Sequence, residues 1–301
     1  MKIVIAGGSG FIGNYLCKRW LAQGNQVTVL SREPKQNTNY NSVYWDGKNL
    51  GDWVKQLEGA DLLLNLSGKS VNCRYTQKNK NAIYQSRIHS TQVLGKAIRQ
   101  LKESPKLWIN ASSATIYNHT TGVANDEEGN NTGFDFSMNV CQQWEAAFNT
   151  SFTNLTRKVI LRPAIVFGAE GGVLPYYKAL AKLGLGGYQG NGNQYISFIH
   201  EEDLARIIEF TIENENIRGI INASVPHPVT NKTFMLKLRE ALSVPFGIPQ
   251  PKWLLKFGAF FLGTETELLL KSRKVVSSKL KSLGFTFNYP TVDHLFANLI
   301  N

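Results

Sequence analysis

The chain has 301 residues and a formal net charge of +11, and 43% of its residues are hydrophobic, as in globular proteins that bury a core. No apolar run reaches the ~18 residues that a membrane-spanning helix needs, so no membrane partner is expected. Three cysteines without metal-ligand spacing predict no metal site and a reducing, cytoplasmic location.

The positive charge is unevenly spread, because residues 1–106 hold 16 basic and 6 acidic side chains. A basic surface can serve nucleic acid, but the sequence has no basic helix interleaved with aromatic residues. We therefore expect no nucleic-acid partner and a polyanionic small molecule in the N-terminal half.

The first half alternates short apolar runs with segments of helical period. Runs rich in Val, Ile and Leu predict buried strands at 2–6, 26–30, 43–45, 61–66, 107–111 and 158–162. Helical spacing predicts helices from residue 11 and over 78–102. This alternation predicts an α/β fold, namely a Rossmann doubly wound parallel sheet with helices on both faces.

A glycine-rich turn, AGGSGFIG, joins the first predicted strand to the first predicted helix. Glycines at this junction permit a tight turn and let a pyrophosphate approach the free N–H groups of the helix N-terminus. The turn therefore predicts dinucleotide binding rather than a merely structural connection. The predicted cofactor contacts here are Gly7, Gly8, Ser9, Gly10, Phe11, Ile12 and Gly13.

The end of the second predicted strand indicates which dinucleotide binds. Arg32 stands there in place of the carboxylate that would accept the ribose hydroxyl of NAD, and a guanidinium suits the 2′-phosphate of NADP. Ser31 is a second predicted donor to that phosphate. Asp46, after the third strand, either accepts from the adenine amine or caps a turn. NADP(H) is the predicted cofactor.

Glycines and prolines cluster after Gly168, and mostly helical segments follow. Helices are predicted near 173–183, 202–213, 231–242, 252–261 and 265–283, with a short strand at 219–224. We predict an NADP-binding domain over 1–170, completed by 196–225, and a smaller substrate lobe over 171–301.

Several blocks resemble the extended branch of the short-chain dehydrogenase/reductase superfamily. They are Asn65-Leu-Ser-Gly68, Ser112-Ser113-Ala-Thr-Ile-Tyr117, Leu161-Arg-Pro163 and Ser197-Phe-Ile-His200. RYTQKNKNAIYQSRIHST, DFSMNVCQQWE and NASVPHPVTN further resemble an atypical subgroup of bacterial and mitochondrial "epimerase family proteins". The resemblance implies cofactor contacts from Asn65, Ser67, Gly68, Ser112 and Pro163.

Arg87 lies on the long helix where extended members commonly place an asparagine. It either reaches a phosphate or carboxylate or makes a structural salt bridge. A basic run, Lys271 to Lys281, is either a solvated helix face or part of a pocket for an anionic substrate.

The catalytic Tyr-x-x-x-Lys pair of the extended branch is missing. Alignment on Trp144 and Glu145 puts Ser137 at the tyrosine position and Cys141 at the lysine position, and no Tyr or Lys lies between His119 and Thr156. An aliphatic hydroxyl such as that of Ser137 is a poor acid and base, so other groups must move any proton.

Three residues are the candidate catalytic groups, each with a structural alternative. Tyr117 is the first candidate proton donor, or else a structural aromatic side chain at a strand end. Ser113 hydrogen-bonds a substrate or caps a turn. Cys141 titrates near neutrality if a positive charge is close, or else is a small buried residue.

Two functions remain open at this point. The first is an NADP(H)-dependent oxidoreductase or epimerase acting on a small substrate, with an anionic one as a possibility that the basic run allows. The second is a non-catalytic NADPH-binding module that reports redox state to a partner. For the chain itself, a monomer or homodimer is expected.

Overall fold

The computed structural model of the chain describes residues 1–36, 38–129, 131–153, 155–255 and 270–300. Its main element is a seven-stranded sheet in the order β11-β6-β5-β4-β1-β2-β3, and every pairing in it is parallel. The strands are β1 (Lys2–Ala6), β2 (Gln26–Ser31), β3 (Asn41–Tyr44), β4 (Leu62–Asn65), β5 (Leu107–Ala111), β6 (Arg157–Pro163) and β11 (Gly219–Ala223). This order confirms the predicted Rossmann sheet.

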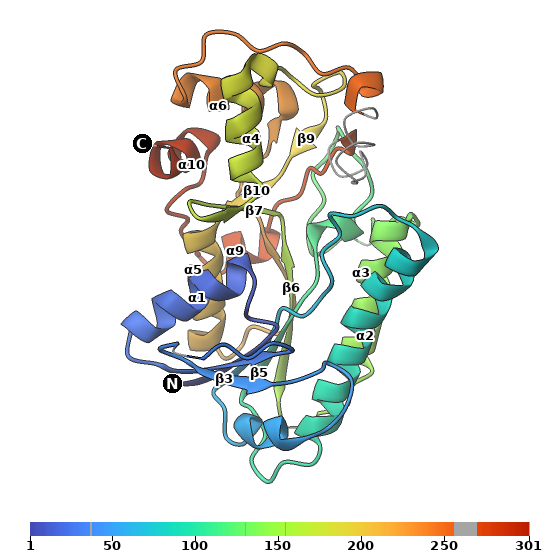
Figure 1. The fold of residues 1–301 in the computed structure, drawn as a ribbon, viewed down its shortest axis with the longest axis vertical. Helices are drawn as coiled ribbons and strands as arrows, with labels where there is room; N and C mark the ends of the chain where they lie inside the picture. Colours follow the sequence, from blue (N-terminus) through green and yellow to red (C-terminus); the bar gives the residue numbers. More distant parts are fainter. Residues whose placement is uncertain (37, 130, 154, 256–269, 301) are drawn as a thin grey trace.

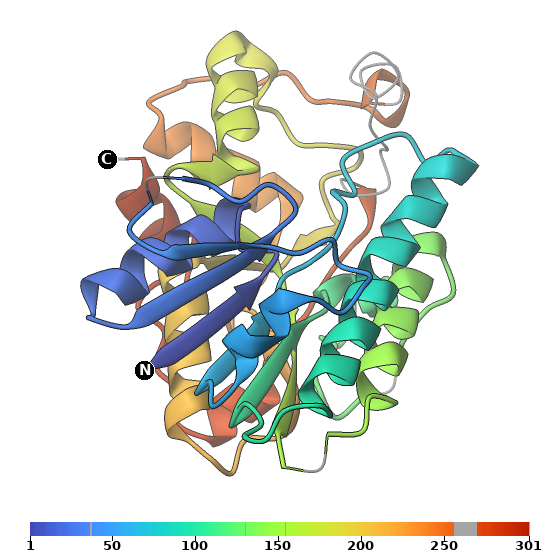
Figure 2. The ribbon, with the colours of Figure 1, turned by 60° about the horizontal axis from the view of Figure 1, so that its bottom comes forward.

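Helices cover both faces of this sheet. On one face α1 (Phe11–Ala22) lies beside α5 (Glu201–Glu213), and on the other α2 (Gln77–Ile98) lies beside α3 (Phe136–Asn149) (Figures 1 and 2). Short 3₁₀ turns, η1 (Asp52–Leu57) and η2 (Ala114–Ile116), follow β3 and β5. Because successive side chains of a strand point to opposite faces, each strand contributes side chains to the helix packing on both faces of the sheet. Ile3 and Ile5 face α1, whereas Val4 and Ala6 face α2.

The lobe sits over the carboxyl edge of the sheet. It contains β7 (Ile165–Gly168), β8 (Gly171–Gly172), α4 (Leu174–Leu180) with a π-helical continuation η3 (Ala181–Leu185), β9 (Tyr195–Ile196), β10 (Phe198–His200), β12 (Val229–Thr230), α6 (Asn231–Ala241), α9 (Ser278–Ser282) and α10 (Val292–Leu299). β7 pairs with β10 and β8, and β9 pairs with β12. Strand β11 returns to the main sheet, where it pairs with β6.

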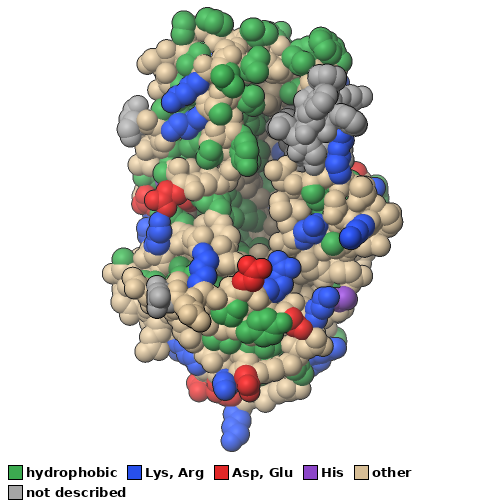
Figure 3. Space-filling model, in the orientation of Figure 1, with side chains coloured by type: hydrophobic (Ala, Val, Ile, Leu, Met, Phe, Trp, Pro, Cys, Tyr) green, Lys and Arg blue, Asp and Glu red, His purple; other side chains and the backbone are tan. Residues whose placement is uncertain are grey.

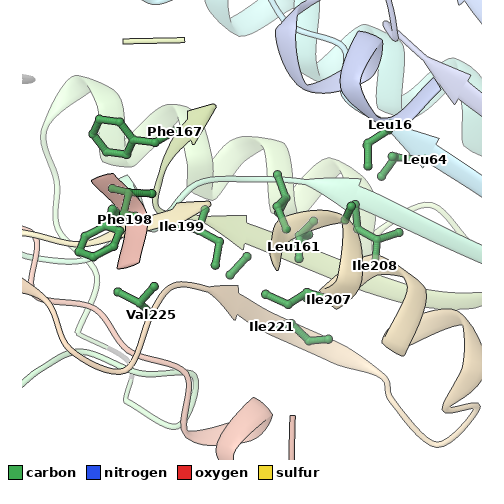
Figure 4. Close-up of a cluster of buried hydrophobic side chains, with 14 of the residues drawn as sticks. Leu16, Leu64, Leu161, Phe167, Phe198, Ile199, Ile207, Ile208, Ile221 and Val225 are labelled. Carbon is green, nitrogen blue, oxygen red and sulfur yellow. The ribbon is translucent and has the colours of Figure 1, made fainter. Parts of the chain in front are cut away.

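One hydrophobic cluster runs from the sheet into the lobe. Figure 4 shows Leu16 and Leu64 at one end of this cluster and Phe167, Phe198 and Val225 at the other. Phe167 lies 5.4 Å from Phe234 of α6, centroid to centroid. The lobe therefore shares a hydrophobic core with the sheet, and this core fixes the position of the lobe relative to the carboxyl edge of the sheet.

Two of the predicted lobe helices are not found as predicted among the described residues. The helix predicted near 252–261 lies outside the described residues beyond Leu255. The helix predicted over 265–283 lies outside the described residues up to 269. For residues 271–277 the prediction is wrong, because they run extended and bond to distant segments, and helix α9 begins only at Ser278. Hydrogen bonds from Ser197, Ser224 and Asn222 to the backbone of residues 271–277 outweigh the helical pattern of that stretch. No helix among the described residues is long and apolar enough to cross a membrane.

Candidate functional site

The glycine turn between β1 and α1 is built around two close approaches. Gly7 has φ +76°, and a Cβ on it would lie 2.8 Å from the Cα of Ser67 in the loop after β4. A Cβ on Gly13 would lie 2.2 Å from the carbonyl oxygen of Gly8. Only glycine fits at these two positions, so the turn lies against the β4 loop and α1 lies against the turn.

The space in front of α1 is open, in contrast to the sides of the turn. A Cβ on Gly10, the N-cap, would meet nothing within 4 Å. No side chain in the described chain caps the helix, and its first turn holds no acidic residue. The free N–H groups and the helix dipole at this end favour an anion, so the turn fits the pyrophosphate of a dinucleotide.

The other residues of the turn differ in what they contact. Ser9 is exposed, and Phe11 and Ile12 are half-buried. The ring of Phe11 lies where a Cβ on Gly171 would come within 2.6 Å of it. Phe11 therefore packs α1 against β8 of the lobe. Figure 3 shows a hollow between the lobe and the α2/α3 side.

Ser31 and Arg32, at the end of β2, differ in whether their side chains already have partners. Arg32 is exposed and forms no hydrogen bond or ion pair with another described residue, so its guanidinium is available to a phosphate. The Ser31 hydroxyl is already engaged, because it donates to the carbonyl of Glu33 and accepts from its N–H, both at 3.2 Å.

Asp46 caps the turn that follows it. Its carboxylate accepts from the backbone N–H groups of Lys48 at 2.8 Å and Asn49 at 2.9 Å, and from the Asn49 side chain at 2.7 Å. The bond from the Asn49 backbone is the main cause that lowers the pKa of Asp46. Of the two predicted roles, the structure supplies the turn cap.

In the loop after β4, the structure gives Asn65 and Ser67 different roles. The Asn65 amide is fully buried; it donates to Asn110 at 2.7 Å and to Thr91 at 3.2 Å, and its oxygen accepts from the Ser67 N–H at 3.1 Å. The Asn65 side chain therefore holds the loop in place, and a contact of Asn65 with the cofactor stays a prediction. By contrast, the buried hydroxyl of Ser67 has no partner among the described residues, which fits a ligand group beside the glycine turn.

Arg87 holds this loop from the α2 side. Its guanidinium donates to the carbonyls of Lys69 at 3.0 Å and Ile83 at 3.1 Å, and it lies over the ring of Trp144 at 5.1 Å. A Cβ on Gly68 would come within 2.9 Å of this guanidinium. Arg87 is thus a structural residue, although its partners are carbonyls and a ring rather than the predicted salt bridge.

A buried polar chain crosses the opposite half of the sheet edge. Arg162 on β6 donates from Nε and Nη2 to the two oxygens of Glu145 on α3, at 2.8 and 2.7 Å. The Ser112 hydroxyl donates to Glu145, and Arg162 also donates to the Tyr117 hydroxyl at 2.8 Å. Tyr117 in turn donates to Oδ1 of Asn222 on β11 at 3.0 Å. These hydrogen bonds link α3, the residues after β5, β6 and β11 to one another.

Two of the predicted site residues, Ser112 and Tyr117, belong to this hydrogen-bond network. The Ser112 hydroxyl donates to Glu145 and so has a structural role, and its predicted cofactor contact stays a prediction. Tyr117 is 1% exposed, its hydroxyl has two partners, and burial raises its pKa. The structural alternative for Tyr117 therefore has the support of the geometry, and the catalytic one does not.

Ser113 and Pro163 lie where the two central strands end. The Ser113 side chain is half-buried; it accepts from the N–H of Thr115 at 3.1 Å and thereby caps η2. Pro163 ends β6 and is half-buried. Among the three predicted catalytic residues, Ser113 alone keeps partial access to solvent.

Cys141 and Ser137 face the interior from α3. Burial raises the pKa of the Cys141 thiol to about 12, and the nearby Arg87 charge only partly opposes this. Of the two predicted roles of Cys141, the structure favours the small buried residue, because the cost of desolvating a thiolate exceeds the attraction of the guanidinium. The Ser137 hydroxyl is buried and has no partner among the described residues.

An extended segment, residues 271–277, covers this half of the edge. Val275 is fully buried in a cluster with Tyr117, Cys141, Ala114 and Ile116. The segment is held on both sides by bonds from Ser197, Ser224 and Asn222 to its backbone carbonyls. Cys141 is therefore enclosed by packed side chains.

Comparisons with known proteins agree with this architecture. The sequence model of the NAD dependent epimerase/dehydratase family matches residues 3–224, and a domain of unknown function, DUF1731, matches residues 250–299. An epimerase family protein of Staphylococcus haemolyticus is 32% identical over 301 residues, covering 100% of this chain and 99% of that protein. The human epimerase family protein SDR39U1 is 30% identical over 293 residues, covering 96% of each.

The crystal structure of human SDR39U1 (isoform 2) with NADPH superposes with a TM-score of 0.89 at 29% identity, covering 100% of this chain and 99% of that one. Family profile, whole-length relatives and strand order lead to one assignment. The chain belongs to the NAD-dependent epimerase/dehydratase family and is an atypical member of the short-chain dehydrogenase/reductase superfamily, an epimerase family protein.

Proposed function

We propose that the chain binds NADP(H) at the glycine turn and acts as an oxidoreductase or epimerase on a small substrate. The observation that carries the proposal is the open space before Gly10, at a helix start with neither cap nor acid among its described neighbours. The unpaired hydroxyl of Ser67 faces the same turn. The human relative was crystallised with NADPH, which supports the same cofactor here.

Arg32 is the residue that would select the phosphorylated dinucleotide. It is exposed at the end of β2, and no carboxylate occupies the strand terminus. A guanidinium pairs with a phosphate through two parallel hydrogen bonds, whereas it gains little from a ribose hydroxyl. NADPH is therefore expected to bind more tightly than NADH.

The bound cofactor supplies hydride transfer at its nicotinamide ring. The protein contributes the position of that ring, which Pro163 and the end of β5 would border, and a route for a proton. Among the predicted catalytic groups only Ser113 keeps access to solvent, because Tyr117 and Cys141 are buried and keep their protons. The Ser113 hydroxyl, which donates to Oγ1 of Thr115 at 3.0 Å, is too weak an acid to supply a proton itself, so it would relay one between the substrate and another group. Catalysis would therefore proceed without a tyrosine–lysine pair.

A second candidate function is a non-catalytic NADPH-binding module that acts through a partner. It is favoured by the burial of Tyr117 and Cys141 beneath Val275, which leaves few titratable groups at the place of the usual catalyst. Both candidates require the cofactor site, and only the first requires hydride transfer.

Cofactor selection is tested by calorimetry with NADPH and NADH. Loss of a charge-assisted pair costs about 1.5–3 kcal/mol, so Arg32→Ala should weaken NADPH binding roughly 10- to 150-fold and leave NADH unchanged. Arg99→Ala removes an equally exposed arginine at the end of α2 and serves as the control. Equal affinities of the unsubstituted protein for the two nucleotides would contradict the proposal.

Turnover is tested with NADPH deuterated at C4 and a mixed metabolite extract. Label transfer that survives in Tyr117→Phe but falls in Ser113→Ala supports the first candidate with Ser113 as the proton route. Tight NADPH binding without any transfer supports the second. Transfer abolished by Tyr117→Phe at unchanged stability would restore Tyr117 as the proton donor.

A further inference from the structure

The outer face of helix α4 is apolar although it faces solvent. Leu174, Tyr177 and Ala181 point inward and are buried. On the opposite side Tyr176, Leu180 and Leu183 are 66%, 39% and 74% exposed, at spacings of four and three residues that place them in one stripe. A helix that is apolar on both faces is normally covered on both, so this stripe indicates a second contact surface.

A neighbouring loop extends the stripe. Phe246 and Ile248 are 64% and 54% exposed. The N–H of Ile248 donates to the carbonyl of Gly184 at 2.8 Å, and a Cβ on Gly184 would lie 3.3 Å from the Phe246 ring, so this loop lies directly beside Leu183. We call Tyr176, Leu180, Leu183, Phe246 and Ile248 the lobe tip.

The lobe tip lies at one end of the long axis of the molecule. In Figure 1 the loop after α6 passes over the top of α4, and Figure 3 shows hydrophobic side chains gathered along that end. The surface is therefore a convex end rather than a groove. Large apolar surfaces that stay exposed in a folded chain commonly mark a contact with a partner or a membrane.

The charge around the lobe tip is one-sided. Residues 171–200 and 229–255 contain six Lys and Arg residues and a single acidic residue, Glu240. Glu240 is paired with Lys237 at 3.1 Å. Lys178 and Lys182 lie on the same helical stretch as the stripe, and neither forms an ion pair within the described part of the chain. Lys237 is also paired with Asp293 of α10 at 3.0 Å, so the positive charge beside the apolar stripe that has no acidic partner among the described residues is that of Lys178 and Lys182.

We propose that the lobe tip docks on the surface of membranes that contain anionic phospholipid. Apolar side chains that enter the headgroup region, together with nearby lysines, are the two contributions on which interfacial binding depends. The expectation from the sequence of no membrane partner was based on the lack of a spanning segment, and a surface contact needs none. The proposal is independent of the cofactor and of catalysis.

Two other occupants fit the surface less well. A second copy of the chain would bring its own Lys178 and Lys182 against those of the first across a two-fold axis, where like charges repel. A protein partner would need about one hydrogen bond per 100–200 Å² of interface, and the five side chains of the lobe tip offer one hydroxyl, that of Tyr176. A lipid surface requires neither symmetry nor directional bonds.

The test is sedimentation of the full chain with two kinds of vesicle, one of phosphatidylcholine alone and one of equal parts phosphatidylcholine and phosphatidylglycerol. The chain should pellet with the mixed vesicles and much less with the neutral ones. Phe246→Glu should weaken binding roughly ten- to hundredfold, the range expected when one buried aromatic side chain is lost. Phe152→Glu is the matched control, because Phe152 is 72% exposed in the turn between α3 and β6, at the opposite edge of the sheet.

The charge contribution is tested separately. Each lysine near an anionic surface is worth about 1 kcal/mol, so Lys182→Ala should weaken binding to mixed vesicles about fivefold. Lys96→Ala, which removes an exposed lysine of α2, should change nothing. Absence of pelleting with mixed vesicles, or equal effects of Phe246→Glu and Phe152→Glu, would overturn the proposal. So would ultracentrifugation showing a dimer that Phe246→Glu converts to monomer, since the surface would then belong to a second copy.

Discussion

Two stretches of the same sheet edge are built in opposite ways. At the end of β1 and β2, groups are left without partners: the helix start at Gly10 has open space before it, the Ser67 hydroxyl is unpaired among the described residues, and Arg32 is exposed. At the end of β5 and β6, Glu145 and Arg162 are buried in a closed chain of bonds.

The difference indicates that one part of the sheet edge serves ligand binding and the other serves stability. Unpaired donors at the glycine turn contribute little to folding and are available to a phosphate. The closed chain beside α3 contributes to the folded state instead, because each of its polar groups is satisfied by another part of the protein. Changes in the first region should therefore affect ligand binding alone, and changes in the second should affect stability.

The largest expected effect comes from breaking the buried ion pair. Arg162→Met leaves the Glu145 carboxylate buried with only the Ser112 hydroxyl as a partner. Removal of one member of a buried pair typically costs about 3–5 kcal/mol. Urea unfolding should show a loss of that size in the free energy of unfolding.

The matched control replaces both charges. The double variant Arg162→Met with Glu145→Leu leaves no buried charge and should recover most of the lost stability, since well-packed apolar residues often replace a buried pair without cost. A single Arg162→Met variant that loses less than about 1 kcal/mol, the worth of an exposed pair, would show that the pair is not structural.

An intermediate effect is expected at the glycine turn, and on binding only. Gly10 has φ −86°, which any residue adopts, and a Cβ there meets no other atom within 4 Å. Gly10→Ala should therefore unfold at the same urea concentration as the unsubstituted protein. Against a bound pyrophosphate the methyl group has no room, so NADPH affinity should fall at least about tenfold, or 1.4 kcal/mol.

Gly122→Ala is the control for this substitution. Gly122 lies in the loop after Tyr117, and a Cβ there approaches no atom closer than 3.8 Å, so the added methyl group should change neither stability nor NADPH binding. If calorimetry gave Gly10→Ala the NADPH affinity of the unsubstituted protein, the pyrophosphate would have to lie elsewhere.

The sequence was sufficient to predict the regions whose structure depends on local pattern. The strands at 2–6 and 107–111 match β1 and β5 residue for residue, because a strand buried on both faces is a continuous apolar run. The glycine spacing located the turn, since only glycine tolerates its close approaches. The lack of Tyr and Lys between His119 and Thr156 needed no structure at all.

Regions held by distant partners could not be predicted in this way. Residues 271–277 have a helical pattern but run extended, because the hydrogen bonds from Ser197 and Asn222 that hold them are 54 to 78 residues away in sequence. Asn65 is polar and ends strand β4, at the edge where ligands bind, yet its side chain bonds to Asn110 and Thr91. A single sequence does not distinguish a polar group that holds the fold from one that holds a ligand.

The smallest effect expected concerns pH and the closed region. Burial raises the pKa of the Cys141 thiol from 9.0 to about 12. Below pH 9 the thiol is protonated in both the folded and the unfolded chain, so it does not affect stability. Between pH 9 and 12 only the unfolded chain releases the proton, so stability is lost as the pH rises through this window. From pH 8 to 9.5 the loss from one thiol is roughly 1 kcal/mol.

Urea unfolding at these two pH values measures the effect, and Cys141→Ala removes it. The variant should lose roughly 1 kcal/mol less than the unsubstituted protein over the same interval, whatever its stability at pH 8. Cys73→Ala is the control, because Cys73 is half-exposed in the loop before α2. If Cys141→Ala lost as much stability as the unsubstituted protein, the thiol would titrate alike in both states, and this half of the edge would be open to water, as the glycine turn is.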